Sequence, residues 1–369
     1  MRALHAEKAQ EWYPKERFRT SQGVELEYIY MPQARRSNPR TLVFINGWCL
    51  RHSEWKAQMH RFPGCNLLFF NLRGHGNSEL GSSTPSTFLG DCAQDTAELM
   101  AHLGLGRVTL VMHSMGTLIG TLVAAGRANL GGSRFPVLSS GTGNWEQDGG
   151  NPQVSASYRR ANFPEGKWRP FSQQRKSGSD METGNHFSLP AGPEIDSMVM
   201  VSPVPGNPLN ALPYRWVLGP GVEYALKNPW SAEAARWYAR NFRSDAFVFP
   251  SYLYFKAATW SGASLETYRK FMESILDMKN GTFLTAFRAM VENGDEVGER
   301  MRGLQIPVLA VTGSGDFLVS PSSLEILRER IPRIETKIFW FATHFPHAER
   351  PEEFNRLVAE FVEKIDAGK

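Results

Sequence analysis

Short apolar runs that end in glycine or in a small polar residue alternate with segments of helical spacing in the N-terminal part of the chain. Residues 40–47 (RTLVFING) and 66–76 (NLLFFNLRGHG) are two such runs, and 107–114 (RVTLVMHS) is a third. This pattern is typical of strands buried on both faces, whereas 91–105 and 115–126 have the spacing of helices. Strands joined through helices form right-handed crossovers and a parallel sheet. The sequence therefore predicts an α/β fold with a mostly parallel, doubly wound sheet.

The elements on either side of this region extend the same fold. Residues 17–30 alternate between apolar and polar side chains and break at Gln22 and Gly23, which predicts a β-hairpin. In the helix at 91–105 we expect Asp91 to be the N-cap. Further strands are predicted at 195–206, 306–316 and 336–347, and a closing amphipathic helix at 350–365.

The regular pattern fails in the middle of the chain. Residues 127–191 are rich in Gly, Ser, Pro, Asn and Arg and have no sustained periodicity, so we expect an irregular, disordered insertion. This insertion could be a lid or partner-binding loop, a segment without a catalytic role, or retained non-coding sequence. Residues 229–302 have helical spacing in several pieces, and we expect a helical cap over 207–302, inserted between sheet strands. The core would then comprise 17–126, 192–206 and 303–369.

Composition and charge argue against several classes of protein. The formal net charge is +4 over 369 residues, and no basic helix or aromatic stacking module accompanies it, which argues against nucleic-acid binding. The three cysteines (Cys49, Cys65 and Cys92) are too scattered for a disulfide framework or a zinc site. There is no signal-peptide pattern, membrane-spanning run or nucleotide-binding motif. We expect a cytoplasmic protein that requires no metal or other cofactor and has no membrane span.

Ser114 lies where a predicted buried strand passes abruptly into a predicted helix. A serine on such a turn presents its hydroxyl above the sheet, and the N–H groups that begin the helix face the same place. The usual form of this turn is G-x-S-x-G, in which small residues avoid the neighbouring backbone. Here Gly116 fills the second position and Met112 occupies the first. A serine nucleophile also needs a base and a third group that orients the base.

Two later strands supply these partners. The strand at 306–312 runs through a glycine-rich turn into Asp316, and the strand at 336–341 runs through two residues into His344, so both side chains are expected at the same edge of the sheet as Ser114. The competing acid position, in residues 203–206 after the strand at 197–202, holds no carboxylate, which leaves Asp316 as the orienting acid. His347 is a rival base in the same loop, and we favour His344 because it is nearer the strand end.

These motifs resemble those of the α/β-hydrolase fold enzymes. NLRGHGNS (71–78) is similar to the family's D-x-R-G-x-G-x-S turn, with Asn71 in place of the aspartate, and INGWCLRHSEW (45–55) is similar to its H-G-x oxyanion loop, with Asn46 in place of the histidine. VTGSGDFLVS resembles the acid loop, and THFPHAERPEEFNRLVAEFV resembles the histidine loop and final helix. The GW pair followed by Trp55 resembles the aryl-esterase and cofactor-free perhydrolase branch. The resemblance implies that the backbone N–H groups of Trp48 and Met115 form an oxyanion hole.

The combined prediction is a serine hydrolase that acts on ester-like small molecules through an acyl-enzyme. Ser114 would attack the carbonyl, His344 would take and return the proton, and Asp316 would hold the imidazole tautomer. Aromatic residues of the cap segment favour an apolar or aromatic ester. His113 is expected to be a hydrogen-bonded core residue and Arg73 to brace its turn. The alternatives are a C–C bond hydrolase or perhydrolase with the same triad, and a non-catalytic binding protein.

Overall fold

The structure is a computed structural model of the 369-residue chain. It describes residues 14–33, 39–128, 192–211, 220, 224–228, 230–231, 252–253, 256, 265–279 and 281–368. Residues 129–191 of the predicted insertion (127–191) and slightly less than half of the predicted cap (207–302) lie outside these residues. The boundaries of those two segments therefore stay predictions.

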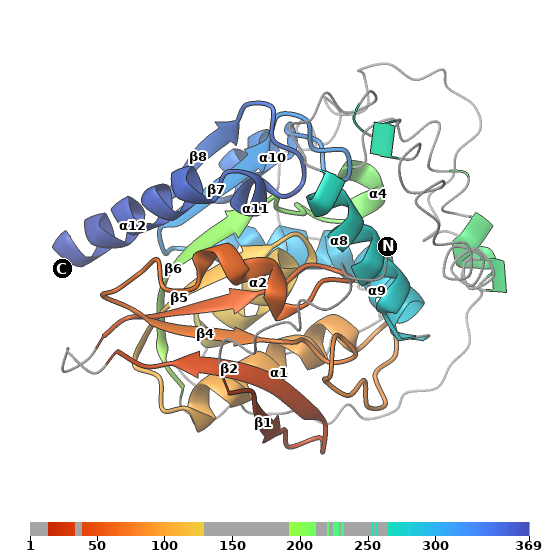
Figure 1. Cartoon of the computed structure of the whole chain (residues 1–369), viewed down its shortest axis with the longest axis horizontal. Helices are drawn as coiled ribbons and strands as arrows, with labels where there is room; N and C mark the ends of the chain where they lie inside the picture. The colour runs from red at the N-terminus through yellow and green to blue at the C-terminus, as the bar shows by residue number, and fades with distance from the viewer. Residues whose placement is uncertain are drawn as a thin grey trace, which may run out of the picture.

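The centre of the fold is an eight-stranded sheet in the order β1-β2-β4-β3-β5-β6-β7-β8 (Figure 1). β2 pairs antiparallel with β1 and with β4, and all the other neighbouring strands are parallel. The strands are β1 (Glu16–Arg19), β2 (Glu25–Met31), β3 (Thr41–Ile45), β4 (Asn66–Phe70), β5 (Arg107–His113), β6 (Glu194–Val201), β7 (Val308–Gly313) and β8 (Ile334–Phe339). The predicted α/β class, the mostly parallel sheet and the N-terminal hairpin are confirmed.

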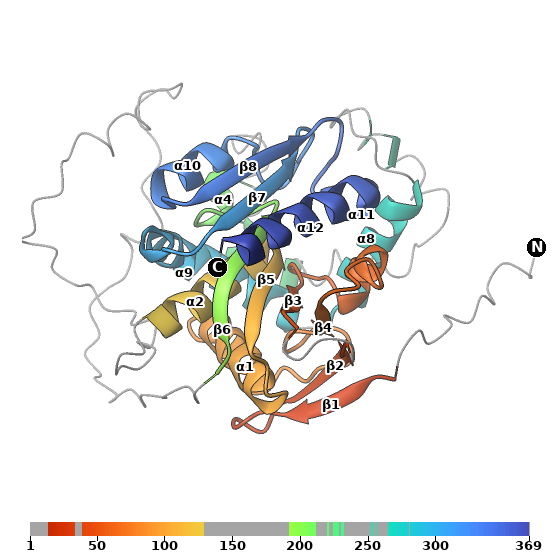
Figure 2. The same cartoon turned by 90° about the vertical axis from the view of Figure 1, so that its left-hand side faces the viewer.

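Helices cover both faces of this sheet, as Figure 2 shows. The described helices are η1 (His52–Gln58), α1 (Phe88–His102), α2 (Met115–Ala128), α4 (Pro208–Ala211), α8 (Leu265–Asp277), α9 (Thr282–Arg300), η3 (Met301–Gly303), α10 (Ser323–Arg330), α11 (Pro346–Glu349) and α12 (Pro351–Ala367). α1, α2, α9 and α10 share one apolar core with the sheet, and η1 and α12 share a second core on the opposite face. Because both faces are covered, β3, β4 and β7 are buried along their whole length.

The start of α1 differs from the sequence prediction. The helix begins at Phe88, three residues before Asp91, and Thr87 occupies the N-cap position. The carboxylate of Asp91 instead accepts hydrogen bonds from the hydroxyls of Thr87 (2.8 Å) and Ser83 (2.7 Å) and lies 3.3 Å from Arg73. Asp91 therefore binds neighbouring side chains from within the first turn of the helix, so its identification as the N-cap was wrong.

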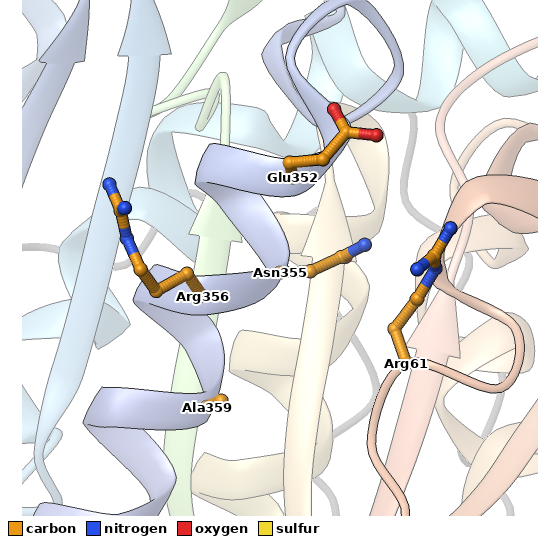
Figure 3. Close-up of a pocket in the computed structure, with 5 residues that line it drawn as sticks. All are labelled: Arg61, Glu352, Asn355, Arg356 and Ala359. Carbon is orange, nitrogen blue, oxygen red and sulfur yellow. The ribbon is translucent and has the colours of Figure 1, made fainter.

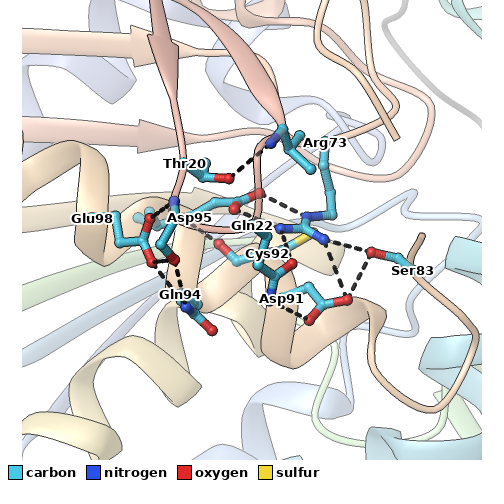
Figure 4. A network of polar contacts seen from close by, with 12 residues as sticks. Thr20, Gln22, Arg73, Ser83, Asp91, Cys92, Gln94, Asp95 and Glu98 are labelled. Carbon is cyan, nitrogen blue, oxygen red and sulfur yellow. Dashed lines mark hydrogen bonds and ion pairs between the residues drawn. The ribbon is translucent and has the colours of Figure 1, made fainter. Parts of the chain in front are cut away.

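A buried ion-pair network joins Arg73 to α1 (Figure 4). The guanidinium donates to both carboxylate oxygens of Asp95, at 2.7 and 2.6 Å, and also to Ser83 and Gln22. Arg73 is 1% exposed, and its guanidinium is occupied by hydrogen bonds to other side chains of the protein. The prediction that Arg73 braces its turn is confirmed.

A second network lies at the edge of the sheet where the parallel strands begin. The buried guanidinium of Arg40 forms ion pairs with Asp196 on β6 and with Asp366 on α12. Arg107 on β5 pairs with the same two carboxylates, at 3.2 and 2.6 Å. Arg40 also donates to the Thr109 hydroxyl at 2.9 Å. The network therefore ties the closing helix to the first residues of the central strands.

Two glycines of α2 make room for the turn between β5 and that helix. A Cβ on Gly116 would lie 2.6 Å from the carbonyl oxygen of Ile45, so only glycine fits where α2 passes β3. A Cβ on Gly120 would lie 1.9 Å from the sulfur of Met112. Met112 occupies the position usually held by glycine, and its side chain fits because Gly120 in α2 has no Cβ.

We predict that Gly120→Ala destabilises the protein by about 1–3 kcal/mol, because the fully buried Met112 must leave its preferred rotamer. The measurement is the urea unfolding midpoint. Gly90→Ala is the matched control, since Gly90 is also helical but a Cβ there meets nothing within 4 Å. This control is expected to stabilise the protein by up to about 1 kcal/mol. Equal effects of the two substitutions would contradict the packing argument.

Candidate active site

Ser114 directly follows β5 and has a left-handed backbone, with φ of 50°. Its N–H donates to the carbonyl of Val201 at 2.9 Å, and its own carbonyl accepts from the N–H of Thr117 at 2.9 Å. Left-handed φ values are uncommon for residues other than glycine and are held only where neighbouring bonds enforce them. The turn leaves the Ser114 side chain partly exposed at the edge of the sheet.

The predicted acid and base lie together at the same edge. Both carboxylate oxygens of Asp316 lie 2.9 Å from Nδ1 of His344. Oδ1 of Asp316 also accepts the backbone N–H groups of Leu318 (3.0 Å) and Val319 (2.9 Å). These donors fix the carboxylate, and a carboxylate at Nδ1 holds the tautomer whose Nε2 is free to accept a proton.

Hydrogen bonds from main-chain N–H groups join the two loops that carry this pair. Gly315 N–H donates to the Ala342 carbonyl (2.9 Å), and Phe341 N–H donates to the Ser314 hydroxyl (2.8 Å). A Cβ on Gly313 would lie 2.1 Å from the Thr343 carbonyl oxygen, so the loops touch backbone to backbone. The separation of Asp316 and His344 is therefore set by the fold rather than by their side chains alone.

Burial determines the electrostatics of the pair. Burial lowers the pKa of His344 below the ordinary histidine value of 6.5, and the charge and hydrogen bond of Asp316 offset only part of this effect. Burial alone would raise the pKa of Asp316, but the interactions with His344 and with Val319 N–H outweigh it and lower that pKa. At neutral pH the pair is therefore an ionised carboxylate and a neutral imidazole, the state in which histidine accepts a proton.

Ser114 lies at the same edge of the parallel strands as this pair but makes no direct hydrogen bond to it. His113, the preceding residue, has its ring 4.8 Å from the ring of His344, centroid to centroid. Within the described residues, no hydrogen bond joins the Ser114 hydroxyl to the His344 ring. Such bonds are often long in unliganded enzymes and shorten when substrate binds.

The predicted oxyanion loop contacts the serine turn. A Cβ on Gly47 would lie 3.3 Å from Cβ of Ser114, so the loop that carries Trp48 is packed directly against the serine. Met115 is the first residue of α2, where N–H groups have no acceptor within the helix. Among the described residues, neither the Trp48 N–H nor the Met115 N–H has a hydrogen-bond acceptor. Both groups remain available for the role that the sequence predicts.

The two asparagines that replace family residues are both hydrogen-bonded. The Asn46 amide donates to the Leu50 carbonyl at 2.7 Å and so closes the oxyanion loop. The Asn71 oxygen accepts from the His52 N–H (2.8 Å), and its amide donates to Glu27 (2.9 Å). An amide that donates on one side and accepts on the other suits a position between a carboxylate and an N–H group.

The two other histidines of the region do not contact Asp316. His113 is fully buried and bonds Glu54 through Nδ1 (2.8 Å) and the His344 carbonyl through Nε2 (2.9 Å), which confirms it as a hydrogen-bonded core residue. His347 is also buried, and its Nε2 lies 3.5 Å from Glu54. Burial lowers the pKa of His347 to about 4. The structure thus pairs Asp316 with His344 rather than with the rival base.

Sequence reasoning missed Glu54, which binds His113 and the Gly47 N–H. Glu54 lies within the stretch that resembles the oxyanion loop, but no spacing pattern distinguishes it from a surface acid. A surface hollow lies between α12 and the chain after η1 (Figure 3). It is lined by Arg61, Glu352, Asn355, Arg356 and Ala359, none of which was predicted to act in catalysis.

Comparison with known proteins identifies the family. A sequence model described as the alpha/beta hydrolase family matches residues 42–357. The chain belongs to this family, which confirms the predicted resemblance and the predicted enzyme class, a hydrolase. Within the described residues, no helix is long and apolar enough to cross a membrane.

The individual proteins that resemble this chain match it either over part of its length or at low sequence identity. A non-heme chloroperoxidase of Kitasatospora aureofaciens is 36% identical over 131 residues, which are 33% of this chain and 42% of that protein, so the match spans less than half of the relative. Among solved structures, a carboxylesterase of Nitrososphaera gargenis has a TM-score of 0.59 at 17% identity and covers 96% of this chain and 100% of its own. An aryl esterase (described as putative) of Burkholderia cenocepacia has a TM-score of 0.57 at 15% identity, with 96% and 100% covered. At these identities the structures show a shared fold.

We predict that His344 titrates below pH 6.5 and that Asp316→Asn lowers its pKa further, because the substitution removes the charge that favours the imidazolium. The measurement is an NMR titration of histidine ring resonances in the folded protein. Asp95→Asn removes another buried carboxylate, one bound to Arg73, and is expected to leave the His344 titration unchanged. A rise in the pKa of His344 in Asp316→Asn would contradict the assignment.

Proposed function

We propose that the protein is a serine esterase that uses Ser114, His344 and Asp316 to transfer an acyl group to water. The observation that carries this proposal is the buried Asp316–His344 pair, at 2.9 Å, at the sheet edge where Ser114 is held in a left-handed turn. A neutral imidazole fixed by a carboxylate beside a serine hydroxyl is the arrangement that activates serine as a nucleophile.

The reaction would proceed in two steps. Ser114 Oγ attacks the ester carbonyl while Nε2 of His344 takes the hydroxyl proton, and the same proton passes to the leaving alcohol as the C–O bond breaks. A water molecule then attacks the acyl-serine, His344 again accepts and returns a proton, and the acid leaves. The N–H groups of Trp48 and Met115 would stabilise the oxyanion in both steps, by about 3 kcal/mol for each donor in comparable enzymes.

An aromatic cluster beside the oxyanion loop supports an apolar or aromatic ester as substrate. The ring of Trp48 lies 4.7 Å from that of Phe283 and 4.8 Å from that of Phe287, both on α9. The indole N–H donates to the Phe283 carbonyl at 3.1 Å, so the cluster is tied to the loop that would bind the oxyanion. All three rings are only partly buried, and they leave an apolar surface that an acyl or aryl group can cover.

The match to a non-heme chloroperoxidase favours perhydrolysis as a second candidate function. In that reaction hydrogen peroxide, rather than water, would attack the acyl-serine, and a peracid would leave. The same triad and oxyanion donors would serve both reactions. Peracid formation from the acyl-enzyme in the presence of hydrogen peroxide distinguishes the two.

We predict that a fluorophosphonate probe labels the wild-type protein and that Ser114→Ala abolishes both labelling and nitrophenyl ester hydrolysis, the latter by roughly 10³-fold or more. Ser197→Ala is the matched control. Ser197 is a fully buried serine of β6 whose hydroxyl lies 2.8 Å from that of Thr109, at the opposite end of the strands from the site, so labelling should persist. A folded wild-type protein that resists the probe would instead support a non-catalytic binding protein.

We also predict that Phe287→Ala raises KM for nitrophenyl esters of medium acyl chain and changes kcat less, because it removes apolar surface beside the oxyanion loop. A panel of esters of increasing chain length measures this. Phe18→Ala is the control, since Phe18 on β1, at the far end of the sheet order from the site, packs against His102 with ring centroids 4.8 Å apart. If KM rises equally in both variants, the aromatic cluster is not the substrate surface.

A further inference from the structure

A second histidine–carboxylate pair lies directly behind the predicted triad. The side chain of Glu54, on η1, is 6% exposed. Its Oε1 accepts the N–H of Gly47 at 3.1 Å, and its Oε2 lies 2.8 Å from Nδ1 of His113 and 3.5 Å from Nε2 of His347. The oxyanion loop, the serine turn and the histidine loop therefore meet at a single buried carboxylate.

Both ring nitrogens of His113 face oxygen acceptors. Nε2 lies 2.9 Å from the backbone carbonyl of His344, which can only accept, so Nε2 carries a hydrogen. Nδ1 faces the Glu54 carboxylate, and a neutral imidazole has no second hydrogen to donate there. Either the ring is doubly protonated or Glu54 is protonated.

The contacts of Glu54 favour the doubly protonated ring. Its Oε1 accepts the Gly47 N–H, and its Oε2 faces ring nitrogens of both His113 and His347, so the carboxylate is placed as an acceptor at both oxygens. An acceptor at Nδ1 requires a donor there, so the pair is a buried imidazolium and carboxylate. A buried charge is tolerated when it is paired and hydrogen-bonded in this way.

A metal ion is the other means of holding these groups together. The ligand atoms of Glu54, His113 and His347 lie within 4.8 Å of one another. Two ligands of a tetrahedral zinc ion are about 3.4 Å apart, given bonds near 2.1 Å. The 2.8 Å between Glu54 and His113 is shorter than that and matches a charge-assisted hydrogen bond. The geometry fits a proton between these two groups.

We propose that Glu54 is a positioning residue of the esterase site, which acts by holding protonated His113 in an ion pair that joins the oxyanion loop to the backbone of His344. This inference rests on the proposed function. On one side the carboxylate fixes Gly47, the residue before the predicted oxyanion donor Trp48. On the other side the imidazolium fixes the carbonyl of the predicted base. Ser114 follows His113 directly, so one pair sets the relative positions of nucleophile, base and oxyanion donor.

The test is Glu54→Gln. This substitution keeps the shape of the side chain and removes the negative charge that requires a doubly protonated His113 ring. We expect kcat for a nitrophenyl ester to fall by about tenfold or more while KM changes by less than about twofold, because misplaced catalytic groups slow the chemical step. The rate of fluorophosphonate labelling should fall by the same factor. His113→Gln should have a similar effect, and the double variant should be no slower than the worse single variant.

Glu27→Gln is the matched control. Glu27 is also a buried acid, 4% exposed, and accepts from the side chains of Asn71 and Asn77. This variant is expected to lose stability in urea but to keep kcat. If Glu54→Gln keeps kcat, or if kcat falls in both variants in proportion to lost stability, Glu54 is merely structural and the proposal fails.

A second measurement does not depend on activity. With ¹⁵N-labelled histidine, the NMR spectrum of the wild-type protein near neutral pH should show one ring protonated at both nitrogens, and this signal should be absent from His113→Gln and Glu54→Gln. Only neutral rings in the wild type, or one zinc ion per purified chain, would overturn the ion pair. A protein that shows the doubly protonated ring but resists the fluorophosphonate probe would overturn the proposed function and leave the pair intact.

Discussion

The backbone turn at Ser114 is the constraint on which the rest of the site depends. A serine in the left-handed region is uncommon, and here it is held by hydrogen bonds to Val201 on β6 and from Thr117 in α2. The helix can follow so sharply only because Gly116 lets it pass the Ile45 carbonyl. β5, β6 and the first turn of α2 therefore fix the Ser114 side chain at the edge of the sheet.

Backbone contacts place the other site groups as well. The acid and histidine loops are joined through main-chain groups of Gly315, Ala342 and Phe341, and the oxyanion loop packs on Ser114 through Gly47. This explains why side chains that depart from the family pattern leave the arrangement intact. Asn46 and Asn71 are accommodated because each forms local hydrogen bonds, and Met112 is accommodated because Gly120 leaves space for its side chain. Conversely, the glycines are the positions where substitution is costly.

Much of the fold and of the candidate site could be predicted because each signal was local. Apolar runs ending in glycine or in a small polar residue identified β3, β4, β5 and β7, and Ser114, Asp316 and His344 each stand just past a predicted strand. Glu54 could not be found in this way, because its three partners come from separate segments that only the folded chain brings together. The N-cap of α1 was misplaced because Thr87 and Asp91 are both good capping residues, and the helix begins at the earlier one.

The charge network around Arg40 has a consequence for how the chain accommodates extra length. β6 enters the sheet at Glu194, and Asp196 is held there by Arg40 and Arg107, two residues that precede the long segment between α2 and β6. The register of β6 is thereby decided by groups at its own end rather than by the length of the connection. Because each doubling of a flexible connection costs only about 0.6 kcal/mol, evolution could lengthen or shorten this junction while the strand still returned to the same register.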